Sequence, residues 1–381
     1  MSIRKRTWVT GRGETREAWV VNYTDQAGTR RIATFQRKRD AETYQAQAAS
    51  EVRAGTHSPI GSSITVTEAI EDWLERAELE EVERATLKQY RELGAHIRRR
   101  LGMVRLAGLT TPRVNTFCNE LRRDLSRSMT QKILTALKGV LAEAQRRGTV
   151  AQNTAIGVTL GADKRKAQIE VGRDFPTPDE IRRILEAASA AARPFLVTAS
   201  LTGLRASELR GLRWDDVDLK RGELHVRQRA DRYGTIGRPK SRAGQRTIPL
   251  GPMAVNTLKA WRLANGGSNL VFPTRTGKPI DHSNLLRRLF APAQIAAGVV
   301  TVGGRAKYGL HALRHFYASW CINRRADGGL ELPLKVVQAR LGHASIQITA
   351  DRYGHLFPRG DDGTELALAE RTLLHRVPDA T

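Results

Sequence analysis

Hydrophobic and polar residues alternate along the first part of the chain and then change to a helical spacing. The alternation predicts three short strands, over residues 4–10, 18–24 and 30–35. Turn-forming residues at 25–28 separate the last two strands, and a helical pattern follows over residues 38–53. The aromatic side chains available as a small core are Trp8, Trp19, Tyr23 and Phe35. We therefore expect residues 1–60 to form a three-stranded sheet with one helix.

A breaker-rich segment at residues 57–63 precedes a longer region in which apolar residues recur every three or four positions. Thr65 and Glu68 have capping-box spacing, and Thr111 as a cap with Pro112 in the first turn begins the third helix. The second and fourth helices begin at about residues 84 and 128. The residues expected to face inward are Ile70, Trp73, Leu74, Leu87, Tyr90, Ile97, Val114, Phe117, Leu121, Ile133, Leu137, Val140 and Leu141. Residues 64–160 are therefore expected to form a four-helix bundle.

The next stretch, residues 161–174, has few apolar positions and contains the basic run Lys164, Arg165 and Lys166, which predicts an extended linker. A further domain, residues 175–358, opens at Thr177 with capping-box spacing and Pro178 in the first helical position. The elements expected in this domain are helices over 252–263, 284–297, 312–324, 334–341 and 346–353, and strands over 223–229 and 246–250.

The tail, residues 359–381, carries the apolar pattern Leu366, Leu368, Leu373 and Leu374. This pattern fits packing on a neighbouring subunit or on the chain's own core, and both alternatives stay open. The predicted fold class is α+β, mostly helical, with a small N-terminal three-stranded sheet, a helical bundle and a mixed helical domain that contains a small antiparallel sheet.

Charge points to the kind of partner. Lysine and arginine number 63 against 39 aspartate and glutamate, which gives a formal net charge of +24 and favours a polyanion. A general solubility effect or contact with an anionic membrane surface is the alternative. Cys118 and Cys321 are too few for a disulfide framework, which favours a reducing compartment. We see neither a signal-peptide core nor a long apolar span, so we expect a cytoplasmic protein without a membrane partner.

Groups able to hold and attack a phosphodiester gather in the last third of the chain. His311, Arg314 and His315 lie within five residues, and His343 precedes Tyr353 by ten. Tyrosine has a pKa of about 10, so as a nucleophile it needs cations and a base nearby. Guanidinium groups suit the non-bridging phosphate oxygens because each is always charged and can donate two hydrogen bonds. Arg205 and Arg314 are the candidates for that role, and Glu208 is placed to orient Arg205.

Each residue also has a structural interpretation. Arg205 alone fits a surface helix ion pair with Glu208, and a lone histidine at a helix edge is more often structural. Lys240 lies in a basic turn in which Arg238 and Arg242 are rivals. Tyr353 fits a half-buried aromatic residue on an amphipathic helix, with Tyr308 and Tyr317 as alternative phenols. His315 and His355 are interpreted as packing residues or residues behind the site.

Taken together, these motifs resemble the tyrosine recombinases of the phage integrase family, strongly over residues 174–358 and more weakly before. The resemblance implies a catalytic set of Arg205, Lys240, His311, Arg314, His343 and the nucleophile Tyr353. It selects Lys240, ahead of a sequence like that of residues 246–250, as the donor of a proton to the departing 5′ oxygen. It implies that one of His311 and His343 is a general base and the other a donor to the phosphate. It also implies a 3′ phosphotyrosyl intermediate that requires neither a cofactor nor a metal ion.

The resemblance further implies an arm-type DNA-binding domain (1–60), a SAM-like core-binding domain (64–160), a linker that lets a clamp close on DNA, and a tetramer that works on two attachment sites through a Holliday junction. Candidate DNA contacts are Arg98, Arg99, Arg100, Lys164, Arg165 and Lys166. A DNA-bending host factor and an excisionase are candidate partners. The extra N-terminal domain favours an integrase of a mobile element. A chromosome-dimer resolvase or DNA invertase, a type IB topoisomerase and a non-catalytic DNA-binding regulator are the alternatives.

Overall fold

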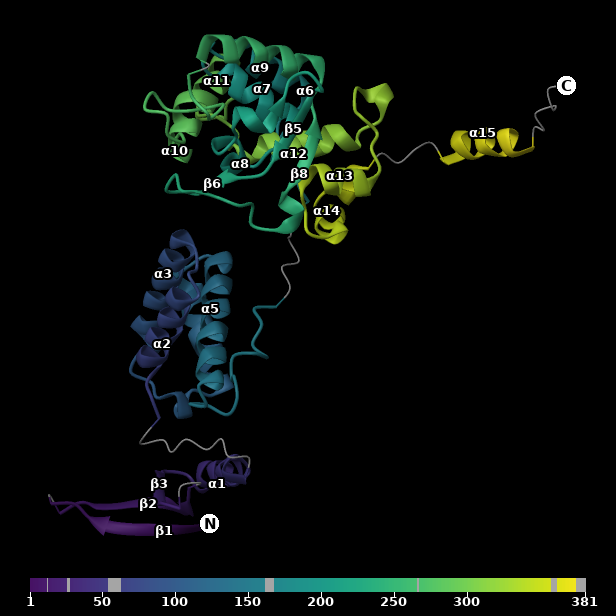
Figure 1. Ribbon diagram of the computed structural model, residues 1–381. Coiled ribbons are helices and arrows are strands. Elements are labelled where there is room, and N and C mark those ends of the chain that lie inside the picture. The colour runs from purple at the N-terminus through teal and green to yellow at the C-terminus, as the bar shows by residue number, and fades with distance from the viewer. Residues whose placement is uncertain are drawn as a thin grey trace. The chain divides into compact units, whose positions relative to one another are not determined.

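The structure, a computed structural model, describes residues 1–11, 13–25, 28–53, 63–161, 168–265, 267–357 and 362–374. The chain divides into two compact units, Met1–Lys164 and Arg165–Thr381, and Figure 1 labels most of their helices and strands. Part of the predicted turn at 25–28 and most of the predicted break at 57–63 lie outside the described residues. The predicted DNA contacts Lys164, Arg165 and Lys166 lie outside them as well.

The chain begins with an antiparallel sheet in the order β1 (Ser2–Val9), β2 (Thr15–Thr24) and β3 (Arg30–Phe35), followed by α1 (Lys38–Arg53). This confirms the predicted sheet and helix, with β1 and β2 starting two or three residues earlier than expected. Val21, Tyr23 and Ala33 pack with Ala41 of α1. Because successive side chains of a strand point to opposite faces, Arg4 and Arg6 lie on the face away from this core, and both are exposed.

The helices of the bundle are α2 (Val66–Leu79), α3 (Arg84–Leu101), α4 (Thr111–Asp124) and α5 (Arg127–Arg146). Its buried core includes Ile70, Ile97, Val114, Phe117, Leu121, Ile133, Leu137, Val140 and Leu141, all of them predicted. The capping box of Thr65 and Glu68 is present. The predicted cap Thr111 is wrong by one position. Thr110 is the N-cap, and the Thr111 hydroxyl instead donates to the Thr154 carbonyl at 2.9 Å.

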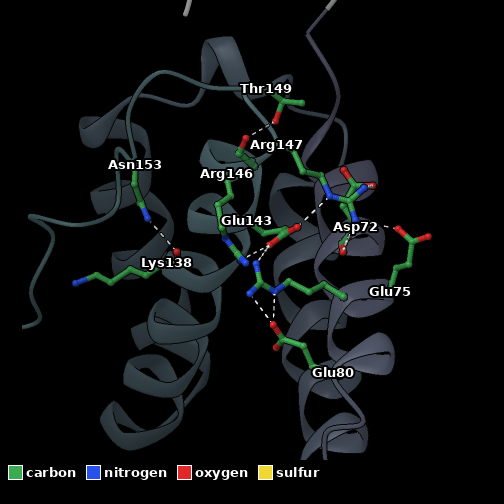
Figure 2. A network of polar contacts seen from close by, with 11 residues as sticks. Asp72, Glu75, Glu80, Lys138, Glu143, Arg146, Arg147, Thr149 and Asn153 are labelled. Atoms are coloured by element: carbon green, nitrogen blue, oxygen red, sulfur yellow. Dashed lines mark hydrogen bonds and ion pairs between the residues drawn. The ribbon is translucent and has the colours of Figure 1, made fainter.

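A network of ion pairs joins the end of α5 to α2 (Figure 2). Glu143, 4% exposed, accepts from Arg76 Nη1 and Arg147 Nε, both at 3.0 Å, and also pairs with Arg146. Arg147 continues to Asp72 at 2.8 Å. A buried carboxylate needs such partners, because an unpaired charge in the interior is costly. These arginines therefore hold the bundle together.

The second unit is mostly helical, and its two most buried helices lie at its centre. Residues 194–200 of α7 and 312–319 of α12 are buried on every side, so other elements surround both helices. The helices of this unit are α6 (Pro178–Ala187), α7 (Arg193–Thr202), α8 (Ala206–Arg210), α9 (Pro252–Asn265), α10 (His282–Asn284), α11 (Ala291–Ala296), α12 (His311–Ile322), α13 (Leu334–Leu341), α14 (Ile346–Tyr353) and α15 (Asp362–Leu374).

Two small sheets replace the single sheet expected here. One has the order β4 (Val217–Asp218), β5 (Glu223–Val226) and β8 (Arg246–Pro249), and the other pairs β6 (Arg229–Ala230) with β7 (Ile236–Gly237). The predicted strand over 223–229 is therefore wrong in its second half. β5 ends at Val226, and the Gln228 side chain donates to the Gly211 carbonyl at 2.7 Å before β6 begins.

The predicted helix over 284–297 is also interrupted. A π-helical turn, Leu285–Phe290, separates α10 from α11, and Pro292 lies at the start of α11, where its missing N–H is tolerated. The capping box at Thr177 and the helices α13 and α14 agree with prediction. The four leucines of the predicted tail are exposed on α15. In the part of the chain described here, no helix has the length and apolar character needed to span a membrane.

Candidate active site

Arg314 is held in the interior of the second unit. It lies on α12, is 2% exposed, and donates from Nη1 to the Gly203 carbonyl at 2.8 Å and from Nη2 to the Leu341 carbonyl at 2.5 Å. Gly203 ends α7 with φ +60°, and a Cβ there would lie 2.3 Å from Cδ1 of Tyr317. Burial and the neighbouring Arg205 lower the pKa of Arg314 to about 9. The guanidinium therefore remains charged at neutral pH.

Arg205 reaches the same region from the start of α8. Its Nη1 donates to Oε1 of Glu208 at 2.8 Å and its Nη2 to the Gly342 carbonyl at 3.2 Å, while its side chain is 37% exposed. Burial of Glu208 acts to raise the pKa of its carboxyl, but Arg246, Arg205 and Arg314 outweigh it and lower that pKa to about 2. The structure thus brings Glu208 against Arg205 as an ionised, 3% exposed partner.

Tyr353 ends α14 and is almost completely buried, at 1% exposure, in a cluster with Tyr317, Val337 and Leu341. Its hydroxyl lies 2.8 Å from Nδ1 of His315. Burial raises the pKa of the phenol, and the nearby arginines, Arg314 first, oppose this. In this form the phenol is protonated at neutral pH and a phosphodiester does not reach it.

His315 is the imidazole that contacts the phenol. Burial, then His311 and Arg352, lower its pKa to about 3, so the imidazole is neutral at pH 7. Nη2 of Arg352 lies 3.4 Å from Nε2 of His315. Because arginine only donates hydrogen bonds, Nε2 is the acceptor and Nδ1 carries the proton. His315 in this tautomer donates to the oxygen of Tyr353 and so contacts the phenol as a donor and not as a base.

The other two imidazoles flank this pair. The His343 ring lies parallel to that of Tyr353, with centroids 6.3 Å apart, and its Nδ1 is 2.9 Å from the Thr349 hydroxyl. The His311 ring meets His315 edge-on at 4.6 Å. Desolvation by the surrounding protein, followed by the positive charge of Arg314, lowers the pKa of both His343 and His311 to about 4, although His311 as a whole residue is exposed. Both rings are therefore neutral at physiological pH and able to accept a proton.

Lys240 is exposed on the segment that joins β7 to β8, and the rivals Arg238 and Arg242 are exposed on the same segment. The segment is tied to the rest of the site near its end, where the Gly244 carbonyl accepts from Arg246 Nη1 at 2.9 Å. The backbone that follows Lys240 is therefore hydrogen-bonded to Arg246, which in turn contacts Glu208.

The predicted DNA contacts at the end of α3 differ in their surroundings. Arg98 forms an ion pair with Glu71, and Arg100 pairs with Asp124 at 2.6 Å. Arg99 is exposed. Arg98 and Arg100 would have to exchange these carboxylates for phosphate in order to contact DNA.

Two features of the site were missed by reasoning from sequence. His315, interpreted as a packing residue or a residue behind the site, contacts the phenol directly, and its spacing of four from His311 on one helix was a usable signal. Arg246, noted only as part of the sequence after Lys240, is bound to both oxygens of Glu208. No periodicity identifies such a contact, because it joins elements distant along the chain. Among the described residues no group of three or more His, Cys, Asp and Glu side chains is placed to hold a metal ion.

A phenol against a neutral imidazole, with two arginines bound nearby, is suited to nucleophilic attack on a phosphodiester. Fixed cations stabilise the charge that develops on the phosphate oxygens. Fold and site together define an enzyme of the DNA breaking and rejoining class.

The model of the phage integrase family matches residues 175–359. The tyrosine recombinase XerC of Xylella fastidiosa (strain M23) is 32% identical over 251 residues, which cover 62% of this chain and 73% of that protein. A tyrosine recombinase XerC-like protein of Caldanaerobacter subterraneus subsp. tengcongensis is 27% identical over 84% of this chain and 87% of its own length. The chain belongs to the phage integrase family of tyrosine recombinases.

Solved structures share the fold. The Tn1549 transposon integrase in complex with transposon right end DNA matches with a TM-score of 0.64 and 18% identity over 81% of this chain and 100% of that one. A λ integrase tetramer bound to a Holliday junction matches with a TM-score of 0.57 and 20% identity over 93% of this chain and 96% of that one. Both confirm the predicted fold class.

Proposed function

We propose that the protein is a site-specific integrase that inserts and excises a mobile element, with Tyr353 as the nucleophile. The observation that carries the proposal is the 2.8 Å contact between the Tyr353 hydroxyl and neutral His315, in the same unit as Arg205 and Arg314. A non-catalytic DNA-binding protein has no need of a phenol kept against an imidazole beside buried arginines.

In the proposed reaction the Tyr353 oxygen attacks the phosphorus and the bond to the 5′ oxygen breaks, which leaves a 3′ phosphotyrosyl ester. Arg205 and Arg314 donate to the non-bridging oxygens, and Lys240 gives its proton to the departing 5′ oxygen. One of His311 and His343 takes the phenolic proton and the other donates to the phosphate. A 5′ hydroxyl of another duplex then displaces the tyrosine, so the ester supplies the energy of rejoining.

Burial of Tyr353 adds a step to this scheme. Because the residue is only 1% exposed, α14 would shift before a phosphate reaches the phenol. His315 then keeps the phenol in a closed position until DNA is bound. We propose that this closed position is the resting form of the enzyme.

DNA contacts are proposed on each part of the chain. The open face of the N-terminal sheet, with Arg4 and Arg6, supports an arm-type binding domain over residues 1–60. The bundle, residues 64–160, would bind the core site with Arg99 among its contacts. Residues 161–174 would form the linker, and residues 359–381 would contact a neighbouring subunit. We further propose a tetramer on two DNA sites, assistance from a DNA-bending factor and an excisionase, and action in the cytoplasm, where the DNA substrate is found.

A resolvase of chromosome dimers is the second candidate, because several relatives are named XerC. The basic N-terminal sheet favours integration, since a resolving enzyme with a single type of site has no need of an additional arm-binding domain. Recombination of two-site plasmids separates these activities. An integrase joins two unlike attachment sites, whereas a resolvase recombines two identical sites. A topoisomerase relaxes a supercoiled plasmid that contains no recombination site.

The chemistry is tested first, by trapping on a nicked suicide substrate without metal or nucleotide, followed by denaturing electrophoresis and peptide mapping. We expect a covalent adduct at Tyr353 and none in Tyr353→Phe, which keeps its affinity for DNA. Tyr308→Phe is the matched control and should form the adduct. An adduct that persists in Tyr353→Phe would refute the assignment, and no adduct on bound DNA would favour the regulator.

A further inference from the structure

The last turn of α13 is the point where the parts of the active site meet. Four consecutive carbonyls, of residues 340–343, each accept a hydrogen bond from a side chain. The donors are Arg246 to Arg340 at 2.7 Å, Arg314 to Leu341 at 2.5 Å, Arg205 to Gly342 at 3.2 Å and Gln338 to His343 at 2.7 Å. The last carbonyls of a helix lack intrahelical partners and carry partial negative charge, so arginines are favoured there.

Arg246 differs from the other two arginines in the number of its N–H groups that already have partners within the protein. Its side chain is 6% exposed, and its Nε donates to the Arg340 carbonyl. Nη1 and Nη2 bind the two oxygens of Glu208 at 3.2 and 2.9 Å, and Nη1 also reaches the Gly244 carbonyl at 2.9 Å. Four of the five N–H groups of the guanidinium are therefore used within the protein.

The partners of Arg246 belong to three different parts of the site. Glu208 binds Arg205 at 2.8 Å, Gly244 closes the segment that carries Lys240, and Arg340 lies three residues before His343. The approach is close, because a Cβ on Gly342 would lie 2.8 Å from the Ala243 carbonyl and 2.9 Å from Nη1 of Arg246. Through these contacts one side chain joins all three parts.

We propose that Arg246 is a positioning residue, which sets Arg205, the Lys240 segment and His343 in register on one phosphate. The inference rests on the proposed function of that site. A lysine at this position would keep the positive charge beside Glu208 but cannot span three carbonyl and carboxylate partners in one plane. Charge alone should therefore fail to support the reaction.

The test compares Arg246→Lys with Arg213→Lys in the full chain. Arg213 is a matched control, because two of its nitrogens donate to the buried carboxylate of Asp216 at 2.9 and 3.2 Å. Asp216 lies in the turn before β4 and not in the active site. We measure single-turnover cleavage of a suicide substrate at saturating DNA, the dissociation constant for the same DNA, and the thermal midpoint. Misplacement of reacting groups by about 1 Å costs on the order of 100-fold in rate.

We expect Arg246→Lys to cleave about 100-fold more slowly than wild type while its DNA affinity and thermal midpoint match those of Arg213→Lys. Cleavage by Arg246→Lys at the wild-type rate would overturn the proposal. Losses of folding or of DNA affinity that account for the whole loss of cleavage would also overturn it, because they indicate a merely structural residue. Failure of the wild type to form an adduct at Tyr353 is a distinct result, which refutes the proposed function.

Discussion

Gly203 ends α7 in a left-handed conformation, and its carbonyl accepts a hydrogen bond from Arg314. The effect of replacing it by alanine on the free energy of unfolding can therefore be estimated. With φ at +60°, an alanine there costs about 1–2 kcal/mol for the left-handed conformation. Its Cβ would also lie 2.3 Å from Cδ1 of Tyr317, a side chain only 1% exposed that has no open space to move into. Such overpacking costs about 1–3 kcal/mol. We expect Gly203→Ala to lower the free energy of unfolding by about 2–5 kcal/mol.

Urea denaturation and single-turnover cleavage together check this expectation. Gly277→Ala is the control, because Gly277 has φ +75° and a Cβ added there would meet nothing within 4 Å, so only the conformational cost of about 1–2 kcal/mol applies. The Gly203 carbonyl accepts from Arg314, and cleavage should therefore fall further than stability alone accounts for. Equal destabilisation of the two variants, with cleavage unaffected in Gly203→Ala, would refute the reasoning.

Three other predictions concern pH, the bundle and the N-terminal sheet. The pKa of His315 is lowered to about 3 in the folded state from 6.5, so its stabilising contribution is present above pH 6.5 and is lost as pH falls below it. At pH 5 the resulting loss in the free energy of unfolding is about 2 kcal/mol. Denaturation of His315→Gln at pH 7 and pH 5 should not show this decrease. Glu143→Gln should destabilise the bundle by about 2 kcal/mol, whereas Glu78→Gln, which breaks an exposed pair, should cost less than about 1 kcal/mol; equal effects in denaturation would contradict the network's role. Removal of residues 1–60 should weaken binding to distal sites more than to the crossover site in gel-shift titrations, and equal weakening would exclude an arm-binding role.

The sequence predicted those elements that carry local signals. The capping box at Thr177 and the apolar stripes of the bundle depend on residues close together in the chain, and both are present. α7 was missed because it is buried on every side and so has no polar face to create a period. The two-residue strands β6 and β7 are too short for alternation to identify.

The same distinction applies to the site. Its residue types and spacing pointed to Arg314 and Tyr353, because each of these residues lies in a motif whose members are close together in the sequence. The burial of Tyr353 and the contacts of Arg246 depend on tertiary packing between residues that are separated in the chain, by 38 positions for His315 and Tyr353 and by 94 for Arg246 and Arg340, and no local pattern reports it.

Crowding of like charges in the free enzyme has a consequence for stability. The guanidinium groups of Arg205, Arg246 and Arg314 face one carboxylate, Glu208, and the lowered pKa of Arg314 reflects both burial and the repulsion from Arg205. Such a region is under electrostatic strain until an anion arrives. A bound phosphate should therefore stabilise the folded state, and inorganic phosphate alone should raise the melting temperature of the protein. Neutralising Arg205 should remove part of this repulsion and also one of the two arginines proposed to bind the phosphate, so the variant should be more stable and a poorer enzyme.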